Sequence, residues 1–151
     1  GVELQDIIYK RYWDVKVEFP DLVRSGRFTD AVDLFIKYEK ELFVRANQLT
    51  ANEILGVLTY YLQRLKMIID LENDKLSSDQ DIDMINAGSS DMAIFGELNT
   101  IDSLANGHLD KYDYYKSLPY HSIFDKLYKN AVERKIQKRY EKIKQQKNKA
   151  K

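Results

Sequence analysis

Apolar residues recur along this chain at the spacings of amphipathic helices. The clearest stripe runs from Ile54 to Ile69 over about five turns, directly after a Thr50-Ala51-Asn52-Glu53 sequence that has capping-box spacing. We expect this helix to lie at the centre of the core. Shorter stripes predict one helix from Leu4 to Phe19 and a second, with Thr29 as its N-cap, that runs to about Asn47.

Proline, glycine and acidic runs mark the predicted ends of these helices. The Phe19-Pro20 pair is expected to end the first helix, because the residue before a proline is pushed out of the α region. The stretch 72–91 contains six acidic residues and two serine-containing runs, and it predicts a flexible acidic loop around one short helix near Ile82 to Ile85. A helix from Asp91 to Ala105 should follow, and Asn106-Gly107 should end it, because both residues tolerate the left-handed conformation.

Two more helices complete the pattern. Asp110 is positioned to cap a short tyrosine-rich helix that ends at Leu118-Pro119, and a last helix is expected from Tyr120 to about Gln146. The apolar content of this last helix falls sharply after Ile136, while lysine and arginine accumulate. No strand pattern and no internal repeat is evident. The pattern therefore predicts an all-α protein, a compact bundle of about five to seven helices with a protruding basic C-terminal helix.

Charge divides the chain into two unequal parts. The 151 residues have a formal net charge of zero, but residues 126–151 contain eleven Lys or Arg against Glu133 and Glu141, which is +9, so residues 1–125 carry −9. We interpret residues 1–125 as an acidic helical core domain and residues 126–151 as a basic C-terminal arm that continues from it. The asymmetry indicates an acidic partner for the arm, although the solvated face of a long helix would have the same composition.

The residues offer little for catalysis, metal binding or membrane insertion. There is no cysteine, which excludes disulfides, thiolate chemistry and cysteine-based zinc sites. His108 lies near Asp102 and Asp110, but no nucleophile, phosphate-binding glycine loop or metal-ligand spacing accompanies it, and His121 at a helix start suits a capping or packing role. We expect no enzymatic site, no cofactor and no metal. The longest apolar runs are far shorter than the roughly 18–20 residues of a spanning helix, so we expect a soluble chain without a membrane partner.

Tyrosine is unusually frequent near the predicted corner at Pro119. Aromatic rings with a polar tip suit half-hydrated contact surfaces, which makes this region a candidate protein interface. The alternative is that the rings cover the core at a tight helix–helix corner. The candidate interface residues are Tyr112, Tyr114, Tyr115, Tyr120 and Tyr128.

The basic arm is a candidate contact for an acidic protein surface or for nucleic acid. Its cations spread around most of the helix circumference, which suits phosphate attraction or protein docking better than base reading. An amphipathic membrane-surface helix would need bulky apolar residues opposite, and none follows Ile143. The candidate contact residues are Arg134, Lys135, Lys138, Arg139, Lys142 and Lys144.

The C-terminal third resembles one group of viral proteins. The sequences Leu104-Ala105-Asn106-Gly107, Asp110-Lys111-Tyr112 and Leu118-Pro119-Tyr120, followed by a Lys/Arg-rich helix, are similar to the ends of small tailed-bacteriophage proteins taken for tail or baseplate assembly chaperones or minor virion components. The resemblance implies a helical structural or assembly protein without catalysis, and it carries over no site residues.

These observations together predict a non-enzymatic protein that acts by contacts with other structural proteins of a larger particle, possibly including itself. Under the resemblance, that particle is a bacteriophage virion or tail, and the protein is a virion component or an assembly chaperone in the virion or the host cytoplasm. The rival hypothesis is a nucleic-acid-binding protein that uses the basic arm in DNA packaging or regulation.

Overall fold

A computed structural model describes residues 8–36, 48–77 and 81–149 of the chain. These residues form seven α-helices and two 3-10 helices, and their only extended pairing is one isolated bridge between Ile8 and Pro119. The protein is therefore all-α, as its apolar spacing predicts. In chain order the elements are α1 (Tyr9–Arg24), α2 (Phe28–Ile36), α3 (Ala51–Leu76), α4 (Ile82–Asn86), η3 (Ser89–Phe95), α5 (Glu97–Ala105), η4 (Leu109–Lys111), α6 (Tyr112–Ser117) and α7 (Tyr120–Lys149).

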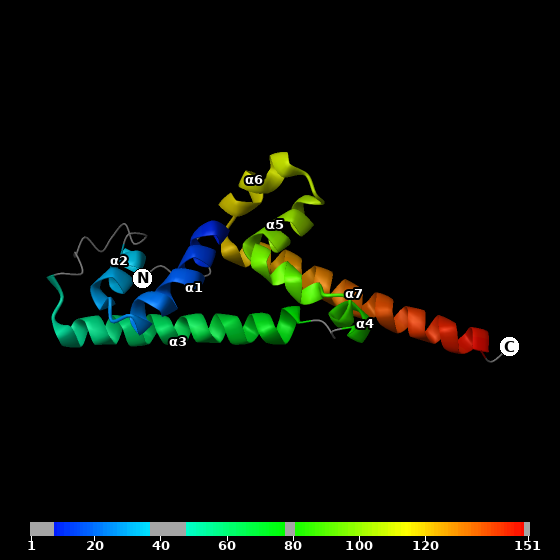
Figure 1. Ribbon diagram of the computed structural model, residues 1–151, viewed down its shortest axis with the longest axis horizontal. Coiled ribbons are helices and arrows are strands. Elements are labelled where there is room, and N and C mark those ends of the chain that lie inside the picture. Colours follow the sequence, from blue (N-terminus) through cyan, green and yellow to red (C-terminus); the bar gives the residue numbers. More distant parts are fainter. Residues whose placement is uncertain (1–7, 37–47, 78–80, 150–151) are drawn as a thin grey trace.

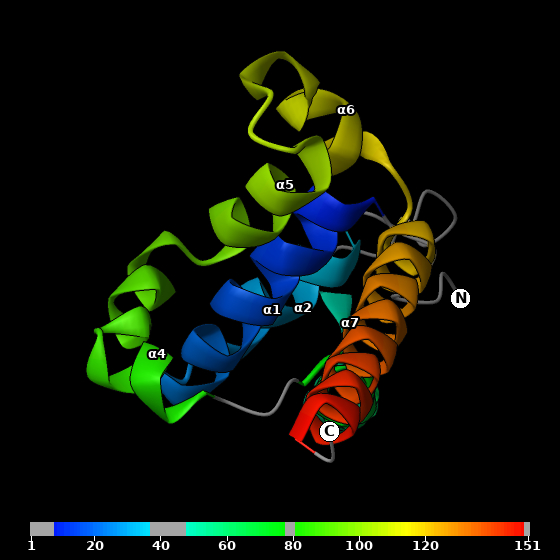
Figure 2. The ribbon, with the colours of Figure 1, turned by 90° about the vertical axis from the view of Figure 1, so that its right-hand side faces the viewer.

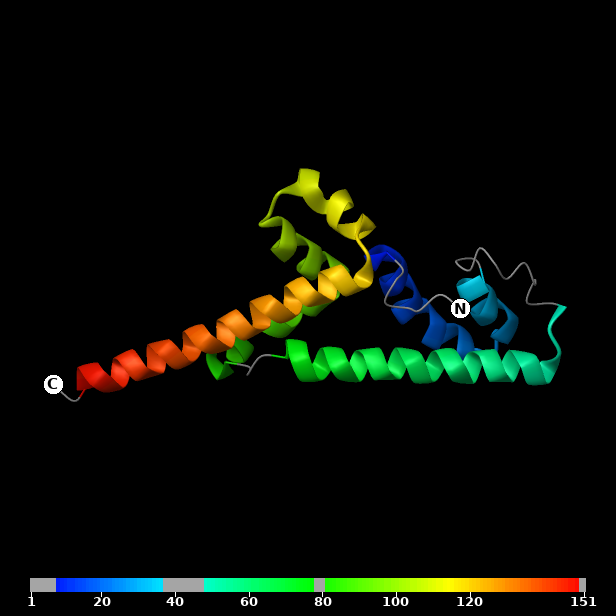
Figure 3. The same ribbon diagram turned by 180° about the vertical axis from the view of Figure 1, so that it is seen from behind.

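The helices form a body around α1, and α7 extends away from it. Helix α1 packs against α2, α6 and α7, while α2 and the start of α7 both pack against the long helix α3 (Figure 1). Helices α5 and α6 pack together on the side of α1 away from α3. Viewed from behind, α7 leaves the body and continues to the C-terminal end (Figure 3). Every described residue of α7 beyond Ala131 is exposed, so the basic C-terminal helix protrudes as predicted.

Helix α1, not α3, lies at the centre of the core. Tyr12, Val15 and Phe19 are fully buried on one face of α1, whereas α3 contributes no side chain buried to that extent. The stripe of α3 still faces the core through Leu58 and Leu65. The prediction placed α3 at the centre because its stripe is the longest, but α3 packs on one side only and leaves its other side in solvent.

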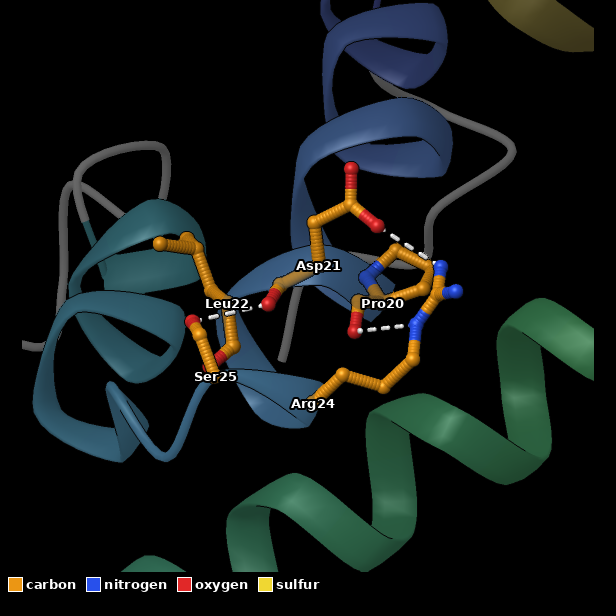
Figure 4. A network of polar contacts seen from close by, with 5 residues as sticks. All are labelled: Pro20, Asp21, Leu22, Arg24 and Ser25. Carbon is orange, nitrogen blue, oxygen red and sulfur yellow. Dashed lines mark hydrogen bonds and ion pairs between the residues drawn. The ribbon is translucent and has the colours of Figure 1, made fainter.

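The first helix does not end at Phe19-Pro20, contrary to the prediction. Pro20 lies inside α1 and cannot donate a hydrogen bond to the carbonyl four residues earlier. The apolar face nevertheless continues, since Leu22 and Val23 also pack against the core. The helix ends one turn later. There the Arg24 side chain donates from Nε to the Pro20 carbonyl at 3.3 Å and pairs with Asp21 at 2.7 Å (Figure 4).

Three predicted boundaries are wrong for local reasons. Thr29 is not an N-cap, because α2 begins at Phe28 and its first bond runs from the Ala31 amide to the Arg27 carbonyl. Asp110 does not cap α6, because it lies inside a 3-10 turn that precedes the helix. The helix predicted from Asp91 is a 3-10 helix followed by α5.

The break before α5 occurs at Gly96, which has φ +49°. A Cβ atom there would lie 3.3 Å from the Trp13 side chain, so glycine permits both the unusual backbone and the close approach to α1. The stop at Asn106-Gly107 is confirmed, with both residues at positive φ and the Gly107 amide bonded to the Asp102 carbonyl.

The predicted acidic loop is also shorter than 72–91. Helix α3 continues to Leu76, so Glu72 belongs to a helix and lies against the core. The short helix near Ile82 to Ile85 is confirmed as α4. Residues 78–80 lie outside the described part of the chain, as do the predicted helix start at Leu4 and the second helix's end near Asn47. In the described part, no helix is both long and apolar enough to cross a membrane.

The capping box at the start of α3 is confirmed. The Glu53 amide donates to the Thr50 hydroxyl at 3.3 Å, and the Thr50 amide donates back to the Glu53 carboxylate at 2.7 Å. The Thr50 amide and the Thr50 hydroxyl both donate to the Glu53 carboxylate, and these two bonds lower the pKa of Glu53 below its usual value.

We expect Thr50→Ala to lower the free energy of unfolding by about 1 kcal/mol, because an amide of the first turn loses its acceptor. Thr59→Ala on the same helix removes only a bond to the Leu55 carbonyl and serves as the control. Urea unfolding of both variants measures the difference. Equal losses would mean that the cap contributes nothing specific.

Candidate protein-interaction surfaces

A polar cluster connects α1, α3 and the start of α7. The Glu72 carboxylate accepts hydrogen bonds from the Tyr12 hydroxyl at 2.9 Å and the Tyr120 hydroxyl at 2.7 Å. It also pairs with the Lys16 ammonium at 2.6 Å, with side-chain exposures of 15% for Glu72 and 26% for Lys16. The rings of Tyr12 and Tyr120 lie against each other, with centroids 3.8 Å apart.

The two tyrosines of this cluster act as fixed hydrogen-bond donors. Burial, followed by the adjacent Glu72 charge, raises the pKa of Tyr12 far above its usual value. Burial and the hydrogen bond to Glu72 raise the pKa of Tyr120 as well. Both hydroxyls therefore stay protonated at physiological pH. Their bonds to Glu72 connect α1 and the start of α7 to α3.

The five candidate tyrosines do not form one surface. Tyr120 is only 5% exposed and belongs to the core, so it cannot contribute to an exposed interface. Tyr112 and Tyr115 are half-buried and pack against the core, and the Tyr112 hydroxyl is bonded to Asp102. These three fit the alternative in which the rings cover a helix corner. Tyr114 is 62% exposed, and Tyr128 is exposed beside Phe124 on α7.

The predicted cation positions all lie on the protruding part of α7. Arg134, Lys135, Lys138, Arg139, Lys142 and Lys144 are exposed. The same part of α7 exposes four large apolar side chains, Val132, Ile136, Tyr140 and Ile143, which we call the arm stripe. The apolar content of this helix falls after Ile136, and these four residues were not predicted to form a surface, although their spacing of four, four and three residues is helical.

A second exposed apolar surface lies where a flexible acidic loop around one short helix was expected. We call it the α4–η3 surface, and its exposed apolar side chains are Ile82, Met84, Ile85, Met92, Ile94 and Phe95. Ile94 is 82% exposed. Asp81, whose carboxylate caps α4, and Asp91 in η3 add negative charge. The acidic residues drew attention to this stretch, and its dense isoleucine, methionine and phenylalanine content was the signal that could have identified a surface.

The α4–η3 surface is held in place by contacts with α5 and α1. The Asn99 side chain donates to the Met92 carbonyl at 2.6 Å, and Gly96 lies against Trp13. Six large apolar side chains exposed within fifteen residues are a candidate contact site, because exposed apolar surface that gathers in one place generally marks such sites.

The two histidines considered for catalysis or metal binding, His108 and His121, are both exposed. Within the ranges described, no three histidine or carboxylate side chains gather closely enough to hold a metal ion.

Glu97 at the start of α5 has a pKa above its usual value. Burial raises it, Lys116 and Lys10 partly oppose the shift, and Asp14 adds to it. Because the pKa of Glu97 is higher in the folded than in the unfolded state, the ionised carboxylate destabilises the fold at pH values above the folded-state pKa. This destabilisation disappears as the pH falls through the folded-state pKa and the carboxyl becomes protonated.

We therefore expect Glu97→Gln to raise the melting temperature at neutral pH and to have little effect near pH 3.5, about the lower limit of ordinary carboxylate titration. Glu133→Gln is the matched control, because the Lys129 hydrogen bond lowers the pKa of Glu133 and reverses the expected sign. Thermal unfolding of both variants at the two pH values tests this. A gain for Glu97→Gln that is equal at both would contradict it.

Comparison of the chain with protein-family models, with curated proteins and with solved structures finds no match.

Proposed function

We propose that the protein is a non-enzymatic assembly protein that acts by contacts with other proteins. The observation that carries the proposal is the gathering of exposed apolar side chains on the arm stripe and the α4–η3 surface. Burying apolar surface stabilises association by roughly 25 cal/mol per Å², and cations around an apolar centre are typical of the rim of a contact. The polar cluster at Glu72 holds the arm in a fixed direction, which lowers the entropic cost of docking it.

We further propose a bacteriophage virion or tail as the particle, with this chain as a virion component or an assembly chaperone. The support is the resemblance of the C-terminal third of the chain, from Leu104 through the Lys/Arg-rich helix, to small phage proteins of that kind. Two exposed tyrosines, Tyr114 on α6 and Tyr128 on α7, offer this chain additional contacts with neighbouring proteins of the particle.

The proposal is tested by the native mass of the chain. Gradient sedimentation of extracts from cells or particles that contain the chain should place it with a larger assembly than the purified chain forms. Ile94→Asn combined with Ile143→Asn should release it, whereas the polar exchange Gln145→Asn should not. A chain that sediments in extracts as it does when pure would contradict the proposal.

A second function is supported by the exposed cations of the arm. If the arm binds nucleic acid, replacing Arg134, Lys135 and Lys138 by glutamine should weaken duplex binding and reduce the slope of log affinity against log salt by about 1 for each phosphate that the arm no longer neutralises. Fluorescence anisotropy with a short duplex measures both. Lys66→Gln on α3 is the control, since Lys66 pairs with Asp70 away from the arm. Binding that is absent, or unchanged in the triple variant, would exclude this use of the arm.

A further inference from the structure

The two exposed apolar surfaces carry opposite charge. Residues 81–95, which include the whole α4–η3 surface, contain three acidic residues, Asp81, Asp83 and Asp91, and neither lysine nor arginine. The arm, residues 126–151, has a net charge of +9. Complementary charge around two apolar centres favours their contact and opposes the pairing of either surface with itself.

The arm stripe has the geometry of a helix that docks on a surface. At about 100° per residue, Val132, Ile136, Tyr140 and Ile143 fall within about 80° of the helix circumference. Arg139 borders this arc, and Glu141 lies on the opposite face. Helix α7 continues to Lys149, so the part beyond Ala131, the last buried residue, is about 27 Å long.

One molecule does not bring its own two surfaces together. The ribbons of α4 and α7 overlap in Figure 1, but the view along the long axis places them on opposite sides of α1 (Figure 2). Helix α7 is continuous to Lys149 and is held at its base by the Glu72 cluster, so it cannot fold back. The complementary surface that the arm can reach belongs to another molecule.

We propose that the arm stripe of one copy docks on the α4–η3 surface of a second copy, and that the exchange is reciprocal. This inference rests on the proposed function and names the partner as the chain itself. A reciprocal exchange uses each surface once and closes with twofold symmetry. It also forms the contact twice in one dimer. Each contact then needs to bury only about half of the roughly 1,600 Å² of a standard interface. The four side chains of the arm stripe and the six of the α4–η3 surface are enough to supply an area of that order.

The test is light-scattering mass during size-exclusion chromatography of the purified full chain. The wild type should have twice the 17.8 kDa chain mass, and its dissociation constant should rise with salt. An arm variant (Ile136→Asn with Ile143→Asn) and a patch variant (Ile82→Asn with Ile94→Asn) should each be monomeric. These positions are exposed, so circular dichroism should show unchanged folding. Gln145→Asn and Ser90→Asn are the matched controls and should remain dimeric.

Mixing gives the decisive result. The arm variant keeps an intact α4–η3 surface and the patch variant keeps an intact arm, so an equimolar mixture has one of the two contacts intact. At concentrations well above the wild-type dissociation constant, the mixture should form a dimer with one of each, weaker than the wild-type dimer, while each variant alone stays monomeric. A dimer that persists in the patch variant would instead indicate pairing of two α7 helices, and a mixture no heavier than the separate variants at those concentrations would contradict the exchange. A monomeric wild type would overturn self-docking and leave the proposed function intact, since a heavy native assembly would then require a different partner.

Discussion

Replacing Phe19 by alanine should lower the free energy of unfolding by about 3–5 kcal/mol, the range for deletion of a buried aromatic ring. Phe19 is fully buried on α1, one residue before the proline inside that helix. Pro20 removes a helical hydrogen bond, and the continuing apolar face offsets that cost. Loss of the ring therefore weakens both the core and the last turn of α1.

The control for this variant is Val17→Ala on the exposed face of the same helix. It should change the free energy of unfolding by less than about 0.5 kcal/mol, as surface substitutions usually do. Urea unfolding followed by circular dichroism measures both. A loss of under about 1 kcal/mol for Phe19→Ala would mean that the end of α1 is not packed as described.

Replacing Glu72 by alanine should cost about 3 kcal/mol. The change leaves the hydroxyls of Tyr12 and Tyr120 without their acceptor and Lys16 without its counter-charge in a largely desolvated site. Each unsatisfied buried donor costs about 1–3 kcal/mol, and loss of one partner of a buried ion pair is strongly destabilising.

A graded pair of variants separates the parts of this loss. Glu72→Gln keeps an oxygen for the two tyrosines but places an amide against Lys16, so about half of the loss should remain. Asp70→Ala removes an exposed partner of Lys66 and should cost less than about 0.5 kcal/mol. Urea unfolding gives the order of the three variants. If Glu72→Ala lowers the free energy of unfolding no more than Asp70→Ala does, the polar cluster at Glu72 does not stabilise the packing of α1, α3 and α7.

The helical architecture was predictable because helix formation leaves local traces. The capping box before α3 and the Asn106-Gly107 stop act within a few residues, and both were identified correctly. The prediction that the first helix ends at Pro20 was wrong for the same reason, because it considered only the local effect of a proline on the residue before it. The stabilising contacts of Leu22 and Val23 with the core come from distant parts of the chain.

The surfaces were harder to predict because they depend on what is left uncovered. Glu72 looked like the start of an acidic loop, and only folding places it between Tyr12 on α1 and Tyr120 on α7. Ile94 and Ile143 are apolar, as core residues are. Their spacing in the sequence does not reveal that the folded chain leaves them uncovered. The cations of the arm were identified because charge content is visible in the sequence.

The most direct test of protein contact as the function is site-specific photo-crosslinking in cells or particles that contain the chain. A photoreactive residue at position 94 or 143 should form adducts with polypeptides of discrete mass, since Ile94 and Ile143 are exposed at the two apolar surfaces. The same group at position 90, next to the α4–η3 residues, or at position 145, on the face of α7 opposite the arm stripe, should form far fewer. Protein adducts confined to positions 94 and 143 are the predicted result. Adducts with nucleic acid alone, or no adducts at either position, would contradict it.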